Sequence, residues 1–260
     1  MNLPFARKRE LGQHFLVDEN IVRVAGRMAD LHADDVVLEV GPGLGVLTAY
    51  LADRVGFVHA VEIDLSLAPH LHQRFGERRN VSLVFEDALE YPLAELDPEP
   101  NKFVANLPYN VATPLIVESL DGLPGIDVWC AMVQREVADR FFADPGTKSY
   151  GAVSVLVQLT ATRTDFHPVS RTVFRPPPNV DSALVAFRRE KRWGPEFRPL
   201  KQLVQAAFAH RRKTLANSLA LSGFERERVE AAVGGLSLPG DVRAERLEPE
   251  AFVQLREVLE

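Results

Sequence analysis

A glycine-rich turn between an apolar run and an amphipathic stretch is the feature that most constrains how this chain folds. Residues 36–40 are mainly β-branched and apolar, as in a buried strand, and the turn Gly41-Pro42-Gly43-Leu44-Gly45 follows directly. Helical periodicity then continues through Tyr50 and Val55. A strand, a tight turn and a helix in this order predict the opening unit of a layered α/β sheet.

The alternation of strands and helices continues along the chain. Apolar runs predict further strands at 57–61, 81–85, 102–105, 128–133, 153–159 and 183–187. Helical patterns lie between the earlier strands of this series, and this alternation predicts a parallel sheet covered on both faces. The expected fold class is therefore α/β, with a doubly wound domain over residues 1–190.

After about residue 190 the pattern changes to helices alone. Residues 191–199 are typical of a linker, and helical periodicity follows at 200–208, 212–219, 225–233 and 249–259. A small all-helical C-terminal domain is therefore predicted for residues 191–260.

Composition excludes several protein classes. No apolar run approaches the roughly 20 residues of a membrane span, and the charged N-terminus is unlike a signal peptide. The single cysteine, Cys130, excludes an internal disulfide framework and predicts a buried thiol, so a cytoplasmic protein is expected. The net charge of −6 argues mildly against a nucleic-acid partner, but residues 188–228 hold 11 Lys/Arg against 4 Asp/Glu. That segment is a candidate phosphate-binding surface, with a solvated helical face as the alternative.

Acidic residues follow the predicted strands where a cofactor would bind. Glu62 ends the strand after the glycine turn and suits a ribose diol, and Asp87 ends the next strand and suits an adenine amino group. A dinucleotide fingerprint would need glycine at position 46, which is Val46. The acid-x-Gly-x-Gly-x-Gly pattern beginning at Glu39 instead resembles the S-adenosylmethionine loop of class I methyltransferases.

The element Asn106-Leu107-Pro108-Tyr109 ends the fourth predicted strand and suits one reaction. An exocyclic amine of a nucleobase is a weak nucleophile because its lone pair is delocalised. Hydrogen bonds from that amine to the Asn106 side chain and a neighbouring carbonyl would direct the lone pair at a methyl group, while Tyr109 stacks on an extruded base. Phe174, followed by Arg175 and three prolines, is the candidate for a second stacking ring, with an ordinary core position as the alternative.

With these motifs in view, the chain resembles the small-subunit ribosomal RNA adenine N6-dimethyltransferases, the family linked to kasugamycin sensitivity. The motifs that carry the resemblance are Leu11–Leu16, Glu39–Gly45, Asn106–Tyr109, Phe174–Ser182 and Phe208–Leu215. The resemblance implies a Rossmann-like class I methyltransferase domain with a helical C-terminal domain. It implies dimethylation, by S-adenosylmethionine, of two adjacent adenosines in a hairpin near the 3′ end of 16S rRNA during small-subunit biogenesis.

The resemblance also assigns site residues. It implies cofactor contacts at His14, Leu16, Gly41, Glu62, Asp87 and Asn106, and catalytic roles for Asn106, Tyr109 and Phe174. It implies RNA contacts at Arg211, Arg212 and Lys213, with packing of the helical domain as their alternative role; Arg7, Lys8 and Arg9 are further candidates. His14 departs from the family, in which many members have asparagine. The partner implied is 16S rRNA in a small ribosomal subunit or its precursor, with no membrane, no metal and a monomeric chain.

Other functions remain open at this point. A large-subunit 23S rRNA adenine methylase of the antibiotic-resistance type would share the fold, although the C-terminal motif favours the small subunit. A non-catalytic assembly or transcription factor would retain the fold without the chemistry, and a small-molecule methyltransferase would have no evident use for a basic helical domain. His70 and His72 lie two apart on a predicted helix, so they do not support a metal site.

Overall fold

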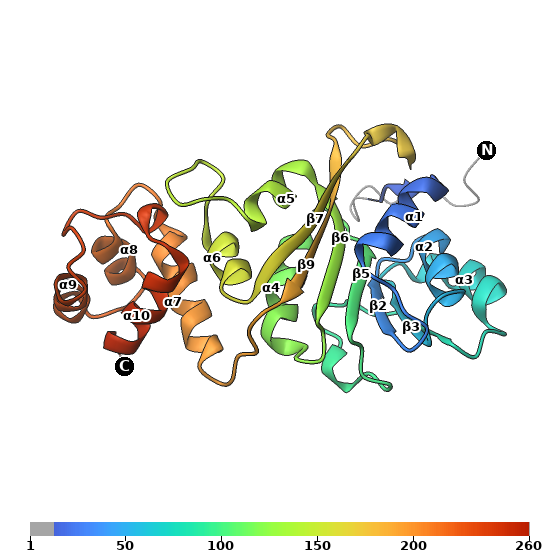
Figure 1. Ribbon diagram of the computed structural model, residues 1–260, viewed down its shortest axis with the longest axis horizontal. Helices are drawn as coiled ribbons and strands as arrows, with labels where there is room; N and C mark the ends of the chain where they lie inside the picture. The colour runs from blue at the N-terminus through green and yellow to red at the C-terminus, as the bar shows by residue number, and fades with distance from the viewer. Residues whose placement is uncertain (1–12, 260) are drawn as a thin grey trace. The chain divides into compact units, whose positions relative to one another are not determined.

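The structure is a computed structural model that describes residues 13–259 (Figure 1). Leu11 and Gly12 of the N-terminal motif, together with the basic residues Arg7, Lys8 and Arg9, lie outside the described residues.

The main structural element is a mixed seven-stranded sheet with the strand order β4-β3-β2-β5-β6-β9-β7. Its strands are β2 (Val36–Val40), β3 (Phe57–Val61), β4 (Val81–Val84), β5 (Lys102–Asn106), β6 (Val128–Gln134), β7 (Ala161–Val169) and β9 (Ser182–Arg189). The five strands from β4 to β6 in this order run parallel, which confirms the α/β class. The sheet as a whole is mixed, because β9 pairs antiparallel with β6. Two short strands, β1 (Phe15–Leu16) and β8 (Phe174–Arg175), form a separate antiparallel pair.

The described helices are α1 (Glu19–Met28), α2 (Val46–Ala52), α3 (Ala68–Phe75), α4 (Ala112–Gly122), α5 (Arg135–Phe141), α6 (Ala152–Gln158), α7 (Phe197–Ala209), α8 (Leu215–Leu221), α9 (Arg226–Gly235) and α10 (Pro249–Leu259) (Figure 1). Within the sheet unit, α4 and α1 lie on opposite faces of the parallel strands. The adjacent residues Trp129 and Cys130 of β6 point to opposite faces, as successive strand residues do. The Trp129 indole donates to Ser119 on α4 at 2.8 Å, whereas the Cys130 thiol contacts the Ala25 carbonyl on α1 at 3.5 Å. Cys130 is fully buried, as predicted, and burial raises the pKa of its thiol to about 12.

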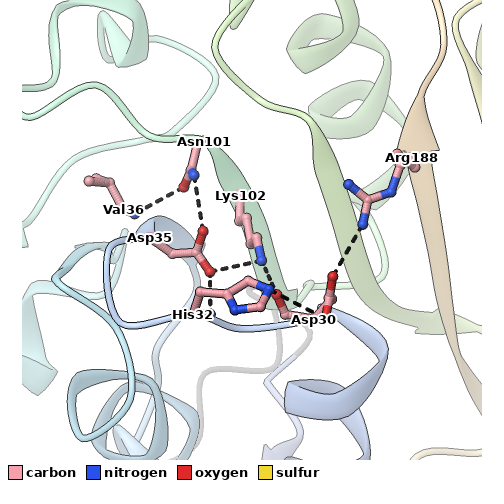
Figure 2. Close-up of polar contacts among 7 residues, drawn as sticks. All are labelled: Asp30, His32, Asp35, Val36, Asn101, Lys102 and Arg188. Carbon is pink, nitrogen blue, oxygen red and sulfur yellow. Dashed lines mark hydrogen bonds and ion pairs between the residues drawn. The ribbon is translucent and has the colours of Figure 1, made fainter.

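A buried polar cluster ties the start of β2 to the start of β5 (Figure 2). The Lys102 ammonium lies 2.8 Å from the Asp35 carboxylate and also donates to the Asp30 carbonyl. The Asn101 side chain accepts from the Val36 N–H at 2.9 Å and donates to Asp35 at 3.0 Å. These contacts fix the start of both strands, whose opposite ends carry the glycine turn and Asn106.

The chain divides into two compact units. One holds the sheet, with residues 13–138 and 162–189, and the other holds residues 139–161 and the helices after residue 190. The sequence predicts two continuous domains that meet at residue 190, whereas in the structure the helical unit also includes residues 139–161. Tyr150 accounts for part of this association, because its buried hydroxyl donates to the Leu247 carbonyl at 2.7 Å.

One predicted element differs from the structure, and one strand of the main sheet lies where the sequence predicts none. The prediction of a strand at 153–159 is wrong, because residues 152–158 form helix α6. An apolar run this short does not distinguish a buried strand from a buried helix. Strand β7 was not predicted, because most of its side chains are polar or exposed. Among residues 13–259, none of the helices combines the length and apolar character that a membrane crossing requires.

Candidate functional site

The glycine turn after β2 forms one wall of the candidate site. Gly41 and Gly43 have φ values of 75° and 57°, in the left-handed region that favours glycine. A Cβ at Gly41 would lie 3.3 Å from the Pro108 ring, and one at Gly43 would lie 3.0 Å from the Phe15 ring. The turn therefore keeps the backbone close to the cavity and leaves space that a side chain would fill.

An open cavity lies at the carboxyl ends of the parallel strands, and its empty space of about 700 Å³ includes solvent at the mouth. It lies in the sheet unit, and its lining brings together three motifs that are far apart in the sequence. The lining residues are Gln13–Leu16, Glu39, Gly41–Leu44, Val46, Leu47, Glu62, Ile63 and Asn106–Tyr109. Of the predicted site residues, the cavity thus collects His14, Leu16, Gly41, Glu62, Asn106 and Tyr109.

A second cavity, of about 480 Å³, shares part of this lining. Gly41, Glu62, Ile63 and Pro108 line both cavities, and Asp87 lines the second. The apolar neighbours Ile63 and Ala88 also line the second cavity, which suits a flat heterocyclic ring. Two adjoining cavities with a shared carboxylate fit an elongated ligand that has a ring at one end.

Glu62 is held as an acceptor by the backbone around it. Its carboxylate accepts from the N–H of Gly43 at 3.0 Å and from that of Asp64 at 2.9 Å, and the residue is 5% exposed. Burial raises the pKa of Glu62, and the two backbone N–H groups oppose that rise. Asp87 accepts from the Leu89 N–H at 2.9 Å, which fixes its side chain at the end of β4.

Asn106 and Tyr109 lie side by side with the N-terminal segment. The Asn106 amide donates to the His14 carbonyl at 3.4 Å, and no described residue donates a hydrogen bond to its Oδ1. The Tyr109 ring stacks on the His14 ring with 5.7 Å between centroids, and its hydroxyl lies 2.7 Å from the Ser182 hydroxyl. Burial raises the pKa of Tyr109, so its hydroxyl stays protonated at neutral pH.

The N-terminal motif reaches the site by pairing with the proline-rich motif. Leu16 lies opposite Phe174 in the β1–β8 pair, and the His14 Nδ1 lies 2.8 Å from the Pro176 carbonyl. This pairing carries His14 and Leu16 across to the glycine turn, although about 160 residues separate the two strands.

Phe174 does not line either cavity. Its side chain is fully buried in a core cluster with Leu16, Met132 and Leu184. The prediction that Phe174 supplies a second stacking ring is not supported by this position, because the ring would have to leave its core contacts to reach a base. The alternative given by the sequence, an ordinary core residue, fits this geometry.

The predicted RNA-binding residues lie on the turn between α7 and α8. Thr214 caps α8, and its hydroxyl accepts from the Asn217 N–H, so the helix expected from residue 212 begins only at Leu215. The Arg211 guanidinium donates to the carbonyls of Lys148 and Tyr150 at 3.2 and 3.1 Å. Arg212 and Lys213 are exposed.

The structure adds a cavity residue, Glu39, to those assigned from the sequence, and a packing role for Pro108. The sequence identifies Glu39 only as part of the glycine motif, yet the residue lines the larger cavity and is 1% exposed. Pro108 lines both cavities and packs against Gly41. The signal for Glu39 was available, since a charged residue inside an apolar strand is rarely buried without a role. Within residues 13–259 no group of three or more His, Cys, Asp or Glu side chains is arranged to hold a metal ion.

Comparison with known proteins places the chain among RNA methyltransferases. Residues 5–260 match the family model described as ribosomal RNA adenine dimethylase. The ribosomal RNA small subunit methyltransferase A of Rubrobacter xylanophilus is 49% identical over 248 residues, which cover 95% of this chain and 93% of the relative. The protein of the same name from Streptomyces coelicolor is 42% identical over 258 residues, covering 96% and 90%.

Solved structures show the same fold. A dimethyladenosine transferase from Plasmodium falciparum superposes with a TM-score of 0.77 at 24% identity, covering 93% of this chain and 96% of that one. The 23S rRNA methyltransferase ErmE superposes with a TM-score of 0.65 at 32% identity, covering 94% and 99%. From the match over residues 5–260 and the relatives of nearly equal length, the chain belongs to the ribosomal RNA adenine dimethylase family.

Proposed function

We propose that this protein transfers methyl groups from S-adenosylmethionine to N6 of two adjacent adenosines near the 3′ end of 16S rRNA. The observation that carries the proposal is the meeting of Asn106 and Tyr109 with the glycine turn at one cavity, in a chain related over its whole length to small-subunit methyltransferases. The target would be a small ribosomal subunit or its precursor, met in the cytoplasm by a monomer. The proposed reaction requires neither a membrane nor a metal ion.

The residues present fit S-adenosylmethionine. Two adjoining cavities accommodate an amino-acid tail and an adenine ring, and the glycine turn leaves room beside them. Glu62 would accept hydrogen bonds from the ribose hydroxyls, and Asp87 would accept from the adenine amino group. Gly41, His14 and Leu16 would form the wall around the tail. When bound, the donor supplies an electrophilic methyl group on a positively charged sulfur.

Asn106 would then hold the target amine. Its Nδ2 donates to the His14 carbonyl, which leaves Oδ1 as the acceptor for an N–H of the base. A second N–H would go to a carbonyl of Leu107 or Pro108. Held in this way, the nitrogen lone pair points at the methyl group, and catalysis needs positioning and electrostatics more than a strong base. Tyr109, fixed by Ser182, would stack on the extruded adenine.

The helical unit would contact RNA through the turn before α8. Arg212 and Lys213 are exposed and suit phosphate contacts, and Arg211 would contribute with the part of its guanidinium that its carbonyl partners leave exposed. Phe174 would take part in base stacking only if its segment rearranged when RNA binds.

Methyl transfer to purified ribosomal particles tests the proposal. The protein is incubated with labelled S-adenosylmethionine and 30S particles that lack the modification, with 23S rRNA as the competing substrate, and the modified bases are mapped. We expect two adjacent dimethylated adenosines in the small-subunit RNA. Label found only in 23S rRNA would contradict the proposal.

The resemblance to ErmE supports a second candidate, methylation of 23S rRNA. It is the weaker candidate because a relative named for the small subunit is 49% identical over 95% of the chain, against 32% identity for ErmE. A non-catalytic assembly factor on the same fold would bind the donor without transferring label, so the same assay separates all three.

A further inference from the structure

Glu39 is a buried polar group for which the proposed methyl transfer has no use. Its side chain lines the larger cavity, the residue is 1% exposed, and Oε2 receives no hydrogen bond from any residue in the described range. An ionised carboxylate in such a place is costly unless it is paired. The Glu39 side chain is therefore expected to ionise only when a group in the cavity stabilises its negative charge.

A second carboxylate lies close to Glu39. Glu39 is in register with Ala60 on β3, so Glu62 lies two residues further along that strand direction and on the same face. Two carboxylates in one poorly solvated pocket do not both ionise readily. Glu62 receives backbone N–H groups from Gly43 and Asp64, which stabilise its anion, whereas Glu39 Oε2 receives none. Glu39 is therefore the member of the pair that holds a proton.

The other groups facing Glu39 do not reverse this assignment. Burial raises the pKa of Glu39 to about 8 and the charge of Glu62 adds to the rise, whereas the Thr48 hydroxyl on α2 and the Arg74 guanidinium on α3 lower it. Arg74 is solvent-exposed, and its guanidinium donates to the Leu44 carbonyl, so its charge is shared and screened.

We propose that entry of S-adenosylmethionine displaces the proton of Glu39, so that binding of the donor and release of one proton are linked. The inference rests on the proposed function, because it requires a ligand that carries an ammonium and a sulfonium. Only the O–H bond of the carboxylic acid breaks, and its proton passes to the buffer. The resulting carboxylate faces the cationic ligand and becomes its counter-ion at the floor of the cavity.

Isothermal titration calorimetry of S-adenosylmethionine into the full-length protein measures this proton directly. At pH 7 the binding enthalpy is compared in phosphate and in Tris, whose ionisation enthalpies differ. We expect release of nearly one proton per bound donor, and an affinity that rises about tenfold between pH 6 and 7. The Glu39→Gln variant, an isostere of the neutral acid, should release no proton. The Glu77→Gln variant, a change at an exposed carboxylate on the same unit, should behave as the wild type.

His14 is the competing source of a proton, because its imidazole lines the same cavity. The His14→Asn variant should keep the proton release. The inference would be overturned if proton release were lost in His14→Asn or persisted in Glu39→Gln. It would also be overturned if the wild-type binding enthalpy were the same in both buffers, a measurement that does not depend on the folding of any variant. A wild-type protein that binds no donor in either buffer would instead contradict the proposed function.

Discussion

The ion pair between Asp35 and Lys102 is the place where the structure yields a definite stability change. The two side chains are 5% and 7% exposed and lie 2.8 Å apart. Asp35→Asn keeps the shape of the side chain and removes its charge, leaving the buried ammonium with the Asp30 carbonyl. Removing one partner of a buried pair strands the other charge, so we expect the free energy of unfolding to fall by about 3–5 kcal/mol.

The reverse substitution should cost less. In Lys102→Met the Asp35 carboxylate keeps two donors, the His32 N–H at 2.6 Å and the Asn101 amide at 3.0 Å (Figure 2). We expect a loss of about 1–3 kcal/mol, since only part of the carboxylate's hydrogen bonding is removed. The double variant should then be more stable than the sum of the two losses implies, by about 1–3 kcal/mol.

Urea unfolding checks these values in the unit that holds the pair. The chain has two tryptophans, Trp129 in the sheet unit and Trp193 in the helical unit. A Trp193→Phe background therefore lets fluorescence report the sheet unit alone. Equal losses for Asp35→Asn and Lys102→Met, or strictly additive losses, would refute the reasoning that an unpaired buried ammonium is the main cost.

The pH dependence gives a second check on the same pair. Burial raises the pKa of Asp35, but the hydrogen bonds from Lys102, the His32 N–H and Asn101 outweigh burial and hold it below 3.8. A depressed folded-state pKa contributes stability above pH 3.8 and loses it as the pH falls through the lower value. The Asp35→Asn variant should therefore lose this acid-dependent fall in stability.

Four further outcomes are expected. Asn106→Ala should leave donor affinity within a few-fold and reduce single-turnover methyl transfer at least ~10²-fold, and equal rates would remove Asn106 from the chemistry. Tyr109→Phe should keep most of the turnover, whereas Tyr109→Ala should lose ~10-fold or more because the stacking ring is gone, as steady-state rates would report. The Arg212→Ala, Lys213→Ala double variant should flatten the salt dependence of RNA affinity by ~1 to 2 in log–log slope, as filter binding at several salt concentrations would show. In the wild type, the raised pKa of Glu39 should make the free energy of unfolding fall by about 1.4 kcal/mol per pH unit between pH 4.5 and 8, because the stabilisation present below 4.5 is lost as the pH rises through 8. Glu39→Gln should remove this fall, as urea unfolding at several pH values would show.

Local patterns in the sequence were enough to predict the strands that carry the site. The runs predicted at 36–40, 57–61 and 81–85 correspond to β2, β3 and β4. The glycine turn and Glu62 directly follow the first two strands, and Asp87 lies shortly after the third. The carboxyl ends of parallel strands meet at one edge of a sheet, so side chains placed after those strands come together whatever the distant parts of the chain do.

Other features depended on contacts between distant segments, which no local pattern encodes. The run 153–159 is a helix because it packs in the helical unit, and Phe174 is in the core because its strand pairs with residues 15 and 16. That pairing also places His14 beside Tyr109. Spacing along the chain indicates helical or strand periodicity and turn residues. Burial and ionisation depend on which segments meet, so only the folded structure could show that Glu39 and Glu62 line the same cavity.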